Sequence, residues 1–493
     1  MEESSIRQIV GKKSEELIAI CESFTRSSSS SKVVEIELFV FLLNLGLELI
    51  KSIFQEKIFN YEMGHILKES QRGSVNKGES KRNYVTIFGK MELIRTSYWL
   101  KGVGKFHPSD DYLELPHGHH WSYHLQEIVG SSACDNDYRA SVEVCNKLLN
   151  LELSWKSSER NVGYLGKNVD EYYESKEPIV EQSAVCFSAS FDGKGVTKVV
   201  EIKKEEGVNP KRRLGRGEKL STMEMATVSV VSSFAPKVRT TAAIVDSLMG
   251  TVENKEINNG VAKKQSENDN SWHKNIHRRG HLGQQKKSIE YGINQIKQRM
   301  VNPNSRFVIP IDAGAGLEPK ILECVREMGL ENQFDGIILD IIHVNEYIWE
   351  AATAILGEKS KFKSKWVRTV LTDLLESKTD KVIKGLELTR DKGDFSDSKK
   401  KRIQTTITYF TNHKHKMDYK YFLGKGYPIS SALVESACGH LVKERMEQSG
   451  MRWSSVGAQN ILDLRAVKIN GDLEDFMKFV SKNQHGDGYK AAA

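Results

Sequence analysis

The chain has 493 residues, more than one hydrophobic core usually organises, so about two to four domains or subdomains are expected. With 39% hydrophobic and 28% charged residues it is neither disordered nor fibrous, and a formal charge of +7 is too mild to identify a nucleic-acid binder on its own. The six cysteines form no CxxC pair, which indicates neither a zinc ribbon nor a disulfide framework and favours a cytoplasmic location. Because the start, Met1-Glu2-Glu3, lacks the features of a signal peptide, export is not expected.

Residues 1–75 are predicted to form a helical arm. The serine run at 27–31 marks a joint within it. The most apolar stretch, 33–54, carries Glu35, Glu37 and Glu48, charges that a membrane span would resist. We therefore interpret this stretch as an amphipathic helix that either packs locally or joins two subunits, and we expect no membrane partner.

Residues 76–180 are predicted to combine a small hairpin with a helical region whose pattern suggests DNA binding. Apolar and polar residues alternate from Asn83 to Trp99 around Gly89 and Lys90, which predicts a small β-hairpin. The pattern from His124 to about Tyr173 is helical, and 125–160 resembles a helix-turn-helix, which would place its second helix in the major groove. A plain helical bundle fits that stretch equally well.

Residues 181–345 change in character. Alternation from Val185 to Phe191 predicts a strand that ends in Asp192, with Gly193 and Gly195 forming the turn. The later elements are predicted in chain order as strands at 225–231 and 239–245, a polar linker, a helix at 283–300, a strand at 306–311, a helix at 317–328 and a strand at 334–340. Three strands, helix, strand, helix, strand is the order of a ribonuclease H-like fold.

The remaining chain is predicted to complete that core. Residues 346–410 are helical in pattern and form an insertion, and 411–470 contain a helix that starts after Pro428, with Ser430 or Ser431 as its cap, and carries Glu435 in its first turn. Residues 471–493 are expected to be a tail. The fold class is thus α/β and multidomain: a ribonuclease H-like catalytic domain with a helical insertion, preceded by a mostly helical region with a small hairpin.

Three acidic residues, Asp192, Asp312 and Glu435, are placed to converge from different elements. Clustered carboxylates are the ligands that Mg²⁺ or Mn²⁺ prefers. Two such ions about 3.5 to 4 Å apart activate an oxygen nucleophile and neutralise charge at phosphorus. Each residue alone has a simpler explanation, as a turn former or as a favourable charge at a helix start. The hypothesis of a two-ion site depends on their joint placement.

The sequence around these residues resembles that of the ISKra-type insertion-sequence transposases, within the Mutator-like group of DDE transposases. The first matching block is SFDGKGV at 190–196, followed by RGEK at 216–219 and MATV at 225–228. The second is Ile311-Asp312 before Gly316-Leu317, followed by LDIIHVNEYIW at 339–349. The third is GYPISSALVESAC at 426–438, continuing through KERM at 443–446 to GMRW at 450–453. The resemblance spans roughly residues 80–470.

The resemblance implies a bacterial, nucleoid-associated DNA transposase that binds the terminal inverted repeats of its element and cuts and joins DNA strands with Mg²⁺. Pairing two ends implies a homodimer or larger assembly. Asp192, Asp312 and Glu435 would be the catalytic metal ligands, Asp340 a reserve candidate for the second ligand, and His343 either an accessory residue or a structural histidine. Relatives often carry a cysteine pair after the hairpin, where this chain has Leu100 and Val103, so a metal-bound amino-terminal module is not expected.

Basic residues are the expected DNA contacts, because lysine and arginine gather in short blocks that suit phosphate binding. Trp453 would stack on a distorted base, or would pack beneath a helix end. The predicted DNA contacts are Lys194, Arg212, Arg213, Arg216, Lys219, Lys443, Arg445, Arg452 and Trp453, with further basic blocks at 274–279 and 399–402. Two alternative functions stay open, a catalytically inactive DNA-binding protein derived from a transposase and a ribonuclease H-like nuclease or resolvase.

Overall fold

The computed structural model describes residues 5–71, 73–182, 185–199, 223–257, 272–314 and 316–490. It is a mixed α/β protein that divides into two compact units, which are considered separately below. The first unit comprises residues 1–175 and 463–493, and the second comprises residues 176–462. The expected tail therefore belongs to the first unit, where it forms helix α19 (Leu473–Lys490).

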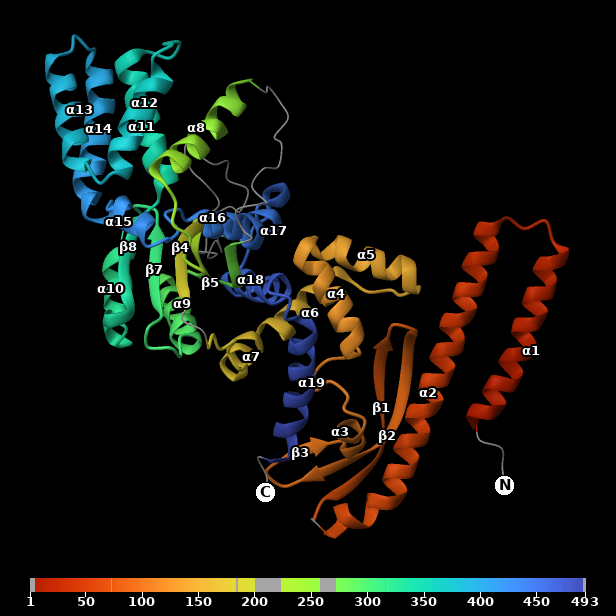
Figure 1. Cartoon of the computed structure of the whole chain (residues 1–493). Coiled ribbons are helices and arrows are strands. Elements are labelled where there is room, and N and C mark those ends of the chain that lie inside the picture. Colours follow the sequence, from red (N-terminus) through yellow and green to blue (C-terminus); the bar gives the residue numbers. More distant parts are fainter. Residues whose placement is uncertain are drawn as a thin grey trace, which may run out of the picture. The chain divides into compact units, whose positions relative to one another are not determined.

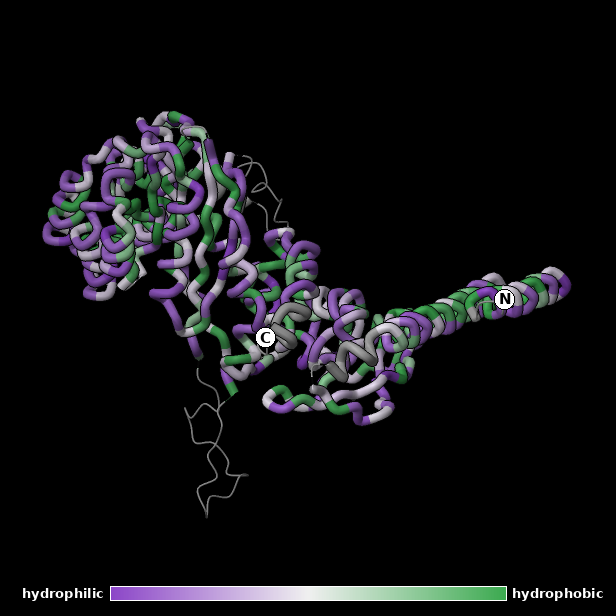
Figure 2. The backbone as a smooth tube through the Cα atoms, turned by 90° about the horizontal axis from the view of Figure 1, so that it is seen from below, coloured by the Kyte–Doolittle hydropathy of each residue, from purple (hydrophilic) through white to green (hydrophobic). Residues whose placement is uncertain are grey.

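The first unit begins with a helical hairpin. Helix α1 (Ser5–Arg26) is followed by the serine run and then by α2 (Ser31–Gln71), so the predicted joint lies between two helices (Figure 1). Apolar side chains are spread around α2 rather than confined to one stripe: Phe41 and Leu43 are buried, whereas Leu42 between them is 53% exposed. Figure 2 shows hydrophobic positions distributed along this hairpin. In the described part of the chain, no helix has the length and hydropathy needed to cross a membrane.

A three-stranded antiparallel sheet packs on α2. It consists of β1 (Val75–Thr86), β2 (Gly89–Leu100) and β3 (Gly104–Phe106), so the predicted hairpin is confirmed and is longer than expected. The hairpin tip approaches α2 so closely that a Cβ on Gly46 would lie 2.5 Å from the ring of Phe88. Glycine at position 46 therefore allows the turn to contact the helix backbone.

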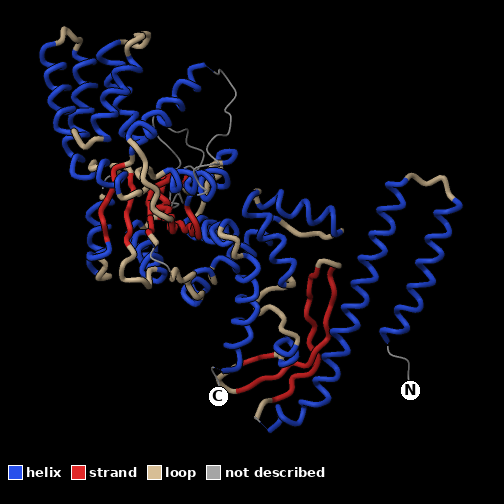
Figure 3. Tube along the Cα trace, in the orientation of Figure 1, coloured by secondary structure: helices blue, strands red, loops and turns tan. Residues whose placement is uncertain are grey.

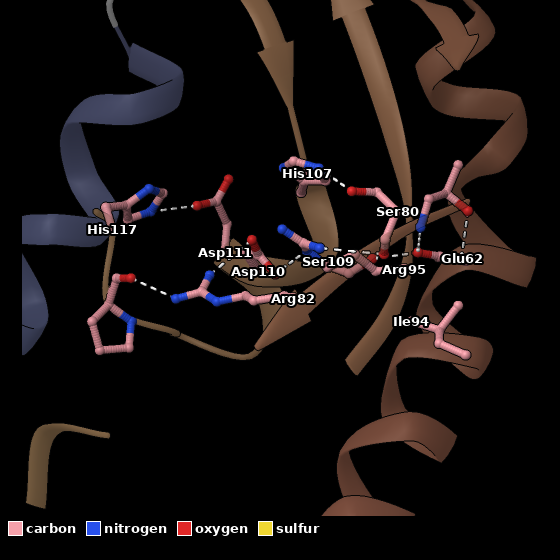
Figure 4. A network of polar contacts seen from close by, with 12 residues as sticks. Glu62, Ser80, Arg82, Ile94, Arg95, His107, Ser109, Asp110, Asp111 and His117 are labelled. Carbon is pink, nitrogen blue, oxygen red and sulfur yellow. Dashed lines mark hydrogen bonds and ion pairs between the residues drawn. The ribbon is translucent and has the colours of Figure 1, made fainter. Parts of the chain in front are cut away.

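A buried polar network joins this sheet to short helix α3 (Pro108–Tyr112) and to α2 (Figure 4). Asp110 accepts contacts from Arg82 at 2.8 Å and Arg95 at 2.7 Å. Glu62 of α2 accepts a hydrogen bond from Ser109 at 2.6 Å. Burial lowers the pKa of nearby His107 to about 4, with the positive charge of Arg95 as a further cause. The network fixes the orientation of α2 on the sheet, because breaking it would leave charges buried without partners.

The helices that follow form a small bundle. They are α4 (Tyr123–Asp135), α5 (Tyr138–Leu149), α6 (Trp155–Gly166) and α7 (Val169–Ser175). Ser122, Asp137 and Ser154 cap the first three of these helices through their side chains. Helices α4, α5 and α6 contact one another pairwise, and Asn150 in the left-handed region ends α5 before the turn into α6. The predicted helices are confirmed, and their contact with DNA stays a prediction.

The second unit is built on a five-stranded mixed sheet in the order β6-β5-β4-β7-β8. The strands are β4 (Cys186–Thr197), β5 (Met223–Phe234), β6 (His273–Leu282), β7 (Arg306–Ile311) and β8 (Phe334–Leu339). Strands β4, β5 and β6 form an antiparallel meander, and β7 and β8 run parallel to β4. Helix α9 (Gln285–Arg299) precedes β7, and α10 (Leu317–Glu327) separates β7 from β8.

Three predictions for this sheet are wrong. Part of the expected polar linker forms strand β6, because alternation turns every second side chain of this polar stretch into the core. Residues 239–245 lie before and within helix α8 (Thr241–Ile257), not in a strand. The β-branched residues there suggested alternation, but the buried pair Val245 and Met249 has helical spacing, and Thr240 accepts a hydrogen bond from Ala243 N at 3.2 Å at the helix start. Gly193 and Gly195 form no turn, because β4 continues through them and pairs with β5 as far as Thr197.

The glycines have a packing role in β4. A Cβ on Gly193 would lie 2.9 Å from the Met225 side chain, and a Cβ on Gly195 would lie 2.3 Å from that of Met223. Two methionines of β5 therefore fold over the space that the glycines leave open. Asp192 therefore lies within β4 and not at its end. The residues before it and after it pair with β5, and no turn follows it.

Separate hydrophobic cores cover the two faces of the sheet. Figure 3 shows the strands of this sheet in red with helices packed around them in blue. Odd-numbered residues of β4 and β7, such as Phe187, Phe191 and Phe307, pack on α9 and α10. The other core joins Val308 and Ile338 to a group of helices that includes the predicted insertion. These helices are α11 (Ile341–Leu356), α12 (Lys363–Leu375), α13 (Thr379–Lys392), α14 (Asp397–His413) and α15 (Tyr419–Gly424). Figure 1 shows α11 to α14 standing together as a bundle.

An irregular helix lies near the end of the second unit. It begins as α16 (Ala432–Ala437), widens into a π-helical segment at Cys438–Lys443 and closes with α17 (Glu444–Met446). The predicted late helix is thus confirmed, with Glu435 in its first turn. Helix α18 (Ser455–Ile469) follows, and the division between the units falls inside it, after Leu462.

Candidate active site

Asp192 lies in β4, and Asp312 directly follows the neighbouring strand β7. The parallel pairing of β4 with β7 joins Cys186 to Arg306 and Ser188 to Val308, an offset of 120 residues. The same offset separates Asp192 from Asp312, which directly follows the last residue of β7. Because side chains alternate between the faces of a strand, both positions face away from the core under α9 and α10.

Glu435 comes to the same face from α16, which packs on β4 and β5. A widened π-helical segment begins three residues later, at Cys438. Such segments are rare and frequently mark functional sites, because the extra residue shifts side chains around the helix. The structure therefore brings the three predicted carboxylates to one face of the sheet, from two strands and one helix.

Asp192 is linked to that helix through Cys438. Burial raises the pKa of the Cys438 thiol, and the hydrogen bond to the Asp192 carboxylate and its negative charge raise that pKa further. The charge of Glu435 acts on the same thiol in the same direction. A thiol that stays protonated donates to the carboxylate without adding charge. Sequence reasoning gave Cys438 no role beyond its place in the last motif.

Glu435 forms an ion pair with His343 of α11. The distance from His343 Nε2 to Glu435 Oε1 is 3.1 Å, and His343 Nδ1 lies 3.1 Å from Glu346 Oε2. The hydrogen bond to Glu435, with the charges of Asp312 and Asp340, raises the pKa of His343 to about 10 despite partial burial. The same contact lowers the pKa of Glu435. A protonated His343 would therefore offset part of the negative charge of the carboxylates around it.

Asp340, the reserve ligand, is fully buried and engaged in hydrogen bonds. Its Oδ1 accepts from Ile342 N at 2.7 Å and so caps α11. Its Oδ2 accepts from Ser431 N at 3.0 Å and also from the Ser431 hydroxyl. Ligand atoms of Asp340, His343 and Glu435 all lie within 4.8 Å of one another. We assign Asp340 a positioning role, because three donors already occupy its oxygens and the loop they hold leads directly into α16.

The predicted triad has a more open arrangement. Among the described residues, Asp192, Asp312 and Glu435 do not form a group whose ligand atoms all lie within 4.8 Å of one another. A pair of ions held by different carboxylates does not require so tight a group, since each ion contacts only some of them. The donor set fits hard divalent cations, because it consists of partly exposed carboxylates on one face and holds an imidazolium as its counter-charge.

Asp312 faces side chains from the helical bundle. Its negative charge raises the pKa of Tyr347 on α11 and of Tyr409 on α14, after burial as the larger cause in both. The rings of these tyrosines stack with centroids 3.8 Å apart. Asp312 also acts on His413, whose pKa is lowered chiefly by burial. Sequence reasoning missed these residues, although the spacing of positions 409 and 413 puts both on one face of a helix.

The predicted DNA contacts fall into three groups. Lys443 and Arg452 are exposed, and Lys194 is partly exposed and lies 3.3 Å from Glu447. Arg445 and Trp453 are buried against each other, with the guanidinium 4.9 Å from the indole centroid. Trp453 also donates to Met446 O at 3.2 Å, so the packing alternative is the one observed. The predicted contacts Arg212, Arg213, Arg216 and Lys219 lie outside the described residues.

The two other basic blocks differ in exposure. Residues 399–402 are exposed on α14. In the block at 274–279, Arg279 is only 1% exposed and stands over the ring of Tyr291 on α9, so the expectation of phosphate contact is wrong for this residue. The block belongs to strand β6, where alternation turns every second side chain into the core.

A second group of potential ligands, Glu290, Cys324 and Glu327, lies between α9 and α10. Lys286 is 3.9 Å from Glu290 and 3.8 Å from Glu327, so a lysine already supplies the positive charge at that place. All six cysteines lie in described parts of the chain and are free thiols.

Comparison with models of protein families finds no match to this chain. No curated protein matches its sequence either. The assignment of a function therefore depends on the residues and geometry described above.

Proposed function

We propose that this protein is a DNA transposase whose reaction centre is formed by Asp192, Asp312 and Glu435. The observation that carries the proposal is the parallel pairing of β4 with β7, whose offset of 120 residues is the same as that between Asp192 and Asp312, together with the packing on β4 of the helix that carries Glu435. The sheet order, an antiparallel meander followed by two parallel strands with helices between them, suits a ribonuclease H-like core. In this proposal α11 to α14 are the helical insertion.

The three carboxylates would hold two magnesium or manganese ions, which supply an activated oxygen nucleophile and neutralise charge at phosphorus. The other residues of the chain position the three carboxylates and balance part of their charge. Strand pairing fixes Asp192, the backbone N–H of Ala313 donates to Asp312 at 2.5 Å, and Asp340 anchors the loop before Glu435. His343 balances the negative charge of Glu435 when no metal is bound.

We further propose that the exposed basic residues bind DNA and that α6 contacts a groove. Lys156 and Arg160 are exposed on α6, and Trp155 at its start is 43% exposed. The short, capped connection from α5 to α6 suits a helix-turn-helix. DNA affinity that depends on such residues falls steeply as salt rises, because phosphate contacts release counterions. Salt-insensitive binding would count against this surface.

Two copies are needed to bring both ends of an element together, so we propose a homodimer or larger assembly. Exposed apolar side chains on the α1–α2 hairpin, including Ile36, Phe39 and Leu42, supply a surface for a second copy. A single copy leaves these side chains facing water, at a loss of hydrophobic free energy that contact with another hairpin would recover.

A strand-joining assay tests the proposal. Purified full-length protein is incubated with Mg²⁺ or Mn²⁺, a target plasmid and pre-cut donor duplexes taken from the DNA flanking the coding sequence. We expect joined products that disappear with Asp192→Ala, Asp312→Ala or Glu435→Ala and persist with Glu358→Ala, which removes an exposed acid elsewhere in the second unit. Joining that survives all three active-site changes refutes the proposal. Metal-dependent cutting without joining would favour a nuclease, and DNA binding without either reaction would favour an inactive relative.

A further inference from the structure

The end of the α11–α14 bundle that points away from the sheet carries a dense positive charge. Two connections form it, residues 357–362 between α11 and α12 and residues 393–396 between α13 and α14 (Figure 3). With the adjoining helix turns they make up residues 357–366 and 390–402, which we call the bundle tip. The bundle tip contains ten basic and four acidic residues, so its formal charge is +6, against +7 for the whole chain.

Contacts between the helices put both connections at the same end of the bundle. Tyr347 of α11 stacks on Tyr409 of α14, and the hydroxyl of Thr406 donates to Tyr347 O at 3.3 Å. Leu356, at the end of α11, and Asp397, at the start of α14, are equally far from this contact along their helices. Because α11 leads away from the sheet and α14 leads back to it, the two connections lie side by side.

The basic side chains of the bundle tip point into solvent and keep their charge unbalanced. Within the described part of the chain, the exposed ones form no ion pair, whereas the acidic Asp391 is already paired with Arg390 at 2.7 Å. Helix dipoles cancel here, since two helices begin and two end at the bundle tip. The side chains therefore set a positive potential that attracts a polyanion. The exposed basic residues are Lys359, Lys361, Lys365, Lys392, Lys399, Lys400, Lys401 and Arg402.

An exposed aromatic ring lies among these charges. Phe362 is 73% exposed, the highest value for a large hydrophobic side chain in the described residues. Its loop is ordered, because Lys363 Nζ donates to Glu358 O at 3.1 Å and Phe362 N donates to Ser360 Oγ at 3.3 Å. An exposed ring is ordinary on its own. A ring among lysines suits nucleic acid, because the cations hold phosphates while the ring packs on sugars or bases.

The arrangement of the helices matches the dimensions of duplex DNA. Helices α12 and α14 lie on a diagonal of the bundle, because each contacts both α11 and α13. With neighbouring axes about 8–10 Å apart, the starts of these two helices are about 11–14 Å apart. The major groove of B-DNA is about 12 Å wide. The lysines at 359–365 and the basic block at 399–402 can therefore contact phosphates on the two sides of one groove.

From these observations we propose that the bundle tip binds duplex DNA through its phosphates and that Phe362 enters the adjoining groove. An anionic membrane would also attract the lysines, but one exposed ring offers little apolar surface for insertion. The inference rests on the proposed function for the nature of the partner, and it extends that function to the far end of the insertion. From His343 to Leu356, α11 rises by about 20 Å, which corresponds to about six base pairs of duplex.

The test uses full-length variants of exposed residues. Lys359→Gln with Lys361→Gln removes two charges from the first connection, and Lys399→Gln with Lys400→Gln removes two from the start of α14. Phe362→Ser removes the ring and keeps every charge. Because all these side chains are exposed, the thermal midpoint of each variant should equal that of the wild type.

Lys287→Gln with Lys297→Gln is the matched control. It also removes two exposed lysines from the second unit, but these lie on α9, which covers the face of the sheet opposite to the three carboxylates. It makes the same change in net charge as each lysine variant of the bundle tip. An effect of net charge alone would therefore appear in the control as well.

We measure binding to a fluorescein-labelled duplex of mixed sequence by fluorescence anisotropy at several salt concentrations. Each lost phosphate contact lowers the slope of log affinity against log salt by about 0.9. We expect each lysine variant of the bundle tip to lower that slope by about 1–2 and the affinity at low salt by about tenfold or more. Phe362→Ser should weaken binding by about fivefold or more at an unchanged slope, because the ring is uncharged. The control should change neither value.

Three outcomes would overturn the inference. Tip variants that bind the duplex with the affinity and slope of the wild type would contradict it, while strand joining by the wild type would leave the proposed function standing. Wild-type protein that binds no duplex would contradict both. Binding to vesicles of phosphatidylserine and phosphatidylcholine that depends on the bundle tip, with DNA binding that does not, would assign this surface to a membrane. If the expected changes appear but the wild type joins no DNA, the inference stands and the proposed reaction fails.

Discussion

Replacing Asp340 separates a positioning role from a metal-binding role. In the structure this carboxylate accepts hydrogen bonds from Ile342 N, Ser431 N and the Ser431 hydroxyl, and it is fully buried. Asp340→Ala removes the cap of α11, which costs about 1 kcal/mol. It also leaves the Ser431 donors buried without an acceptor, at about 1–3 kcal/mol for each group. We expect a total loss of about 3–7 kcal/mol in unfolding free energy.

The assay is urea unfolding of the full-length protein, followed by tryptophan fluorescence and circular dichroism. Asp340→Asn should lose less stability than Asp340→Ala, because it keeps the volume and one acceptor and removes a charge whose burial raises the pKa of the carboxyl group. Asp312→Ala should change the stability little, because Asp312 is partly exposed and lies in a cluster of like charges. The reasoning is refuted if Asp340→Ala loses less than about 1 kcal/mol and abolishes Mn²⁺ binding as fully as Asp312→Ala does.

Three further changes test other parts of the structure. Phe39 and Leu42 of α2 are 44% and 53% exposed, and replacing both by lysine should lower the self-association measured by light scattering. The control Val144→Lys, at a position of α5 that is 56% exposed, should not lower it. Equal masses for the wild type, the double variant and the control would contradict this prediction. Burial lowers the pKa of His119 to about 4, and its Nδ1 accepts a hydrogen bond from Trp121 N. Between its unfolded pKa of about 6.5 and its folded pKa, only the unfolded chain binds the proton. The free energy of unfolding should therefore fall by up to about 3 kcal/mol as the pH falls from 6.5 toward 4. Urea unfolding of His119→Gln should show a smaller loss over the same pH range. Gly426→Ala should lower the thermal midpoint, because Gly426 has φ +74° and a Cβ there would lie 2.5 Å from Lys237 N, whereas Gly424→Ala, with open space around it, should not.

Much of the second unit follows from local pattern. Strand β7 was predicted at its observed bounds, and α10 and β8 to within a residue, because runs such as Arg306–Ile311 are short, apolar and followed by turn residues. Strand β6 was not predicted. Its buried face carries His277, Arg279 and His281, which resemble a surface block in the sequence and become core residues only when α9 supplies Tyr291. That tertiary contact has no local signal.

The candidate site was predictable in part for the same reason. Asp192 could be found because it interrupts an apolar strand, and Asp312 because it follows one. Glu435 could be found because it lies in the first turn of a helix. The strand pairing that aligns the aspartates was inferred only as an adjacency. The partners that define their surroundings, including Cys438, Tyr409 and Ser431, are far away along the chain, and packing alone brings them there.

The most direct test of the central claim is a titration of the full-length protein with Mn²⁺, followed by electron paramagnetic resonance of the free ion. We expect the wild type to bind Mn²⁺, and Asp192→Ala, Asp312→Ala and Glu435→Ala each to weaken that binding by about tenfold or more. Equal Mn²⁺ binding by the wild type and all three variants would show that these carboxylates do not form a shared metal site.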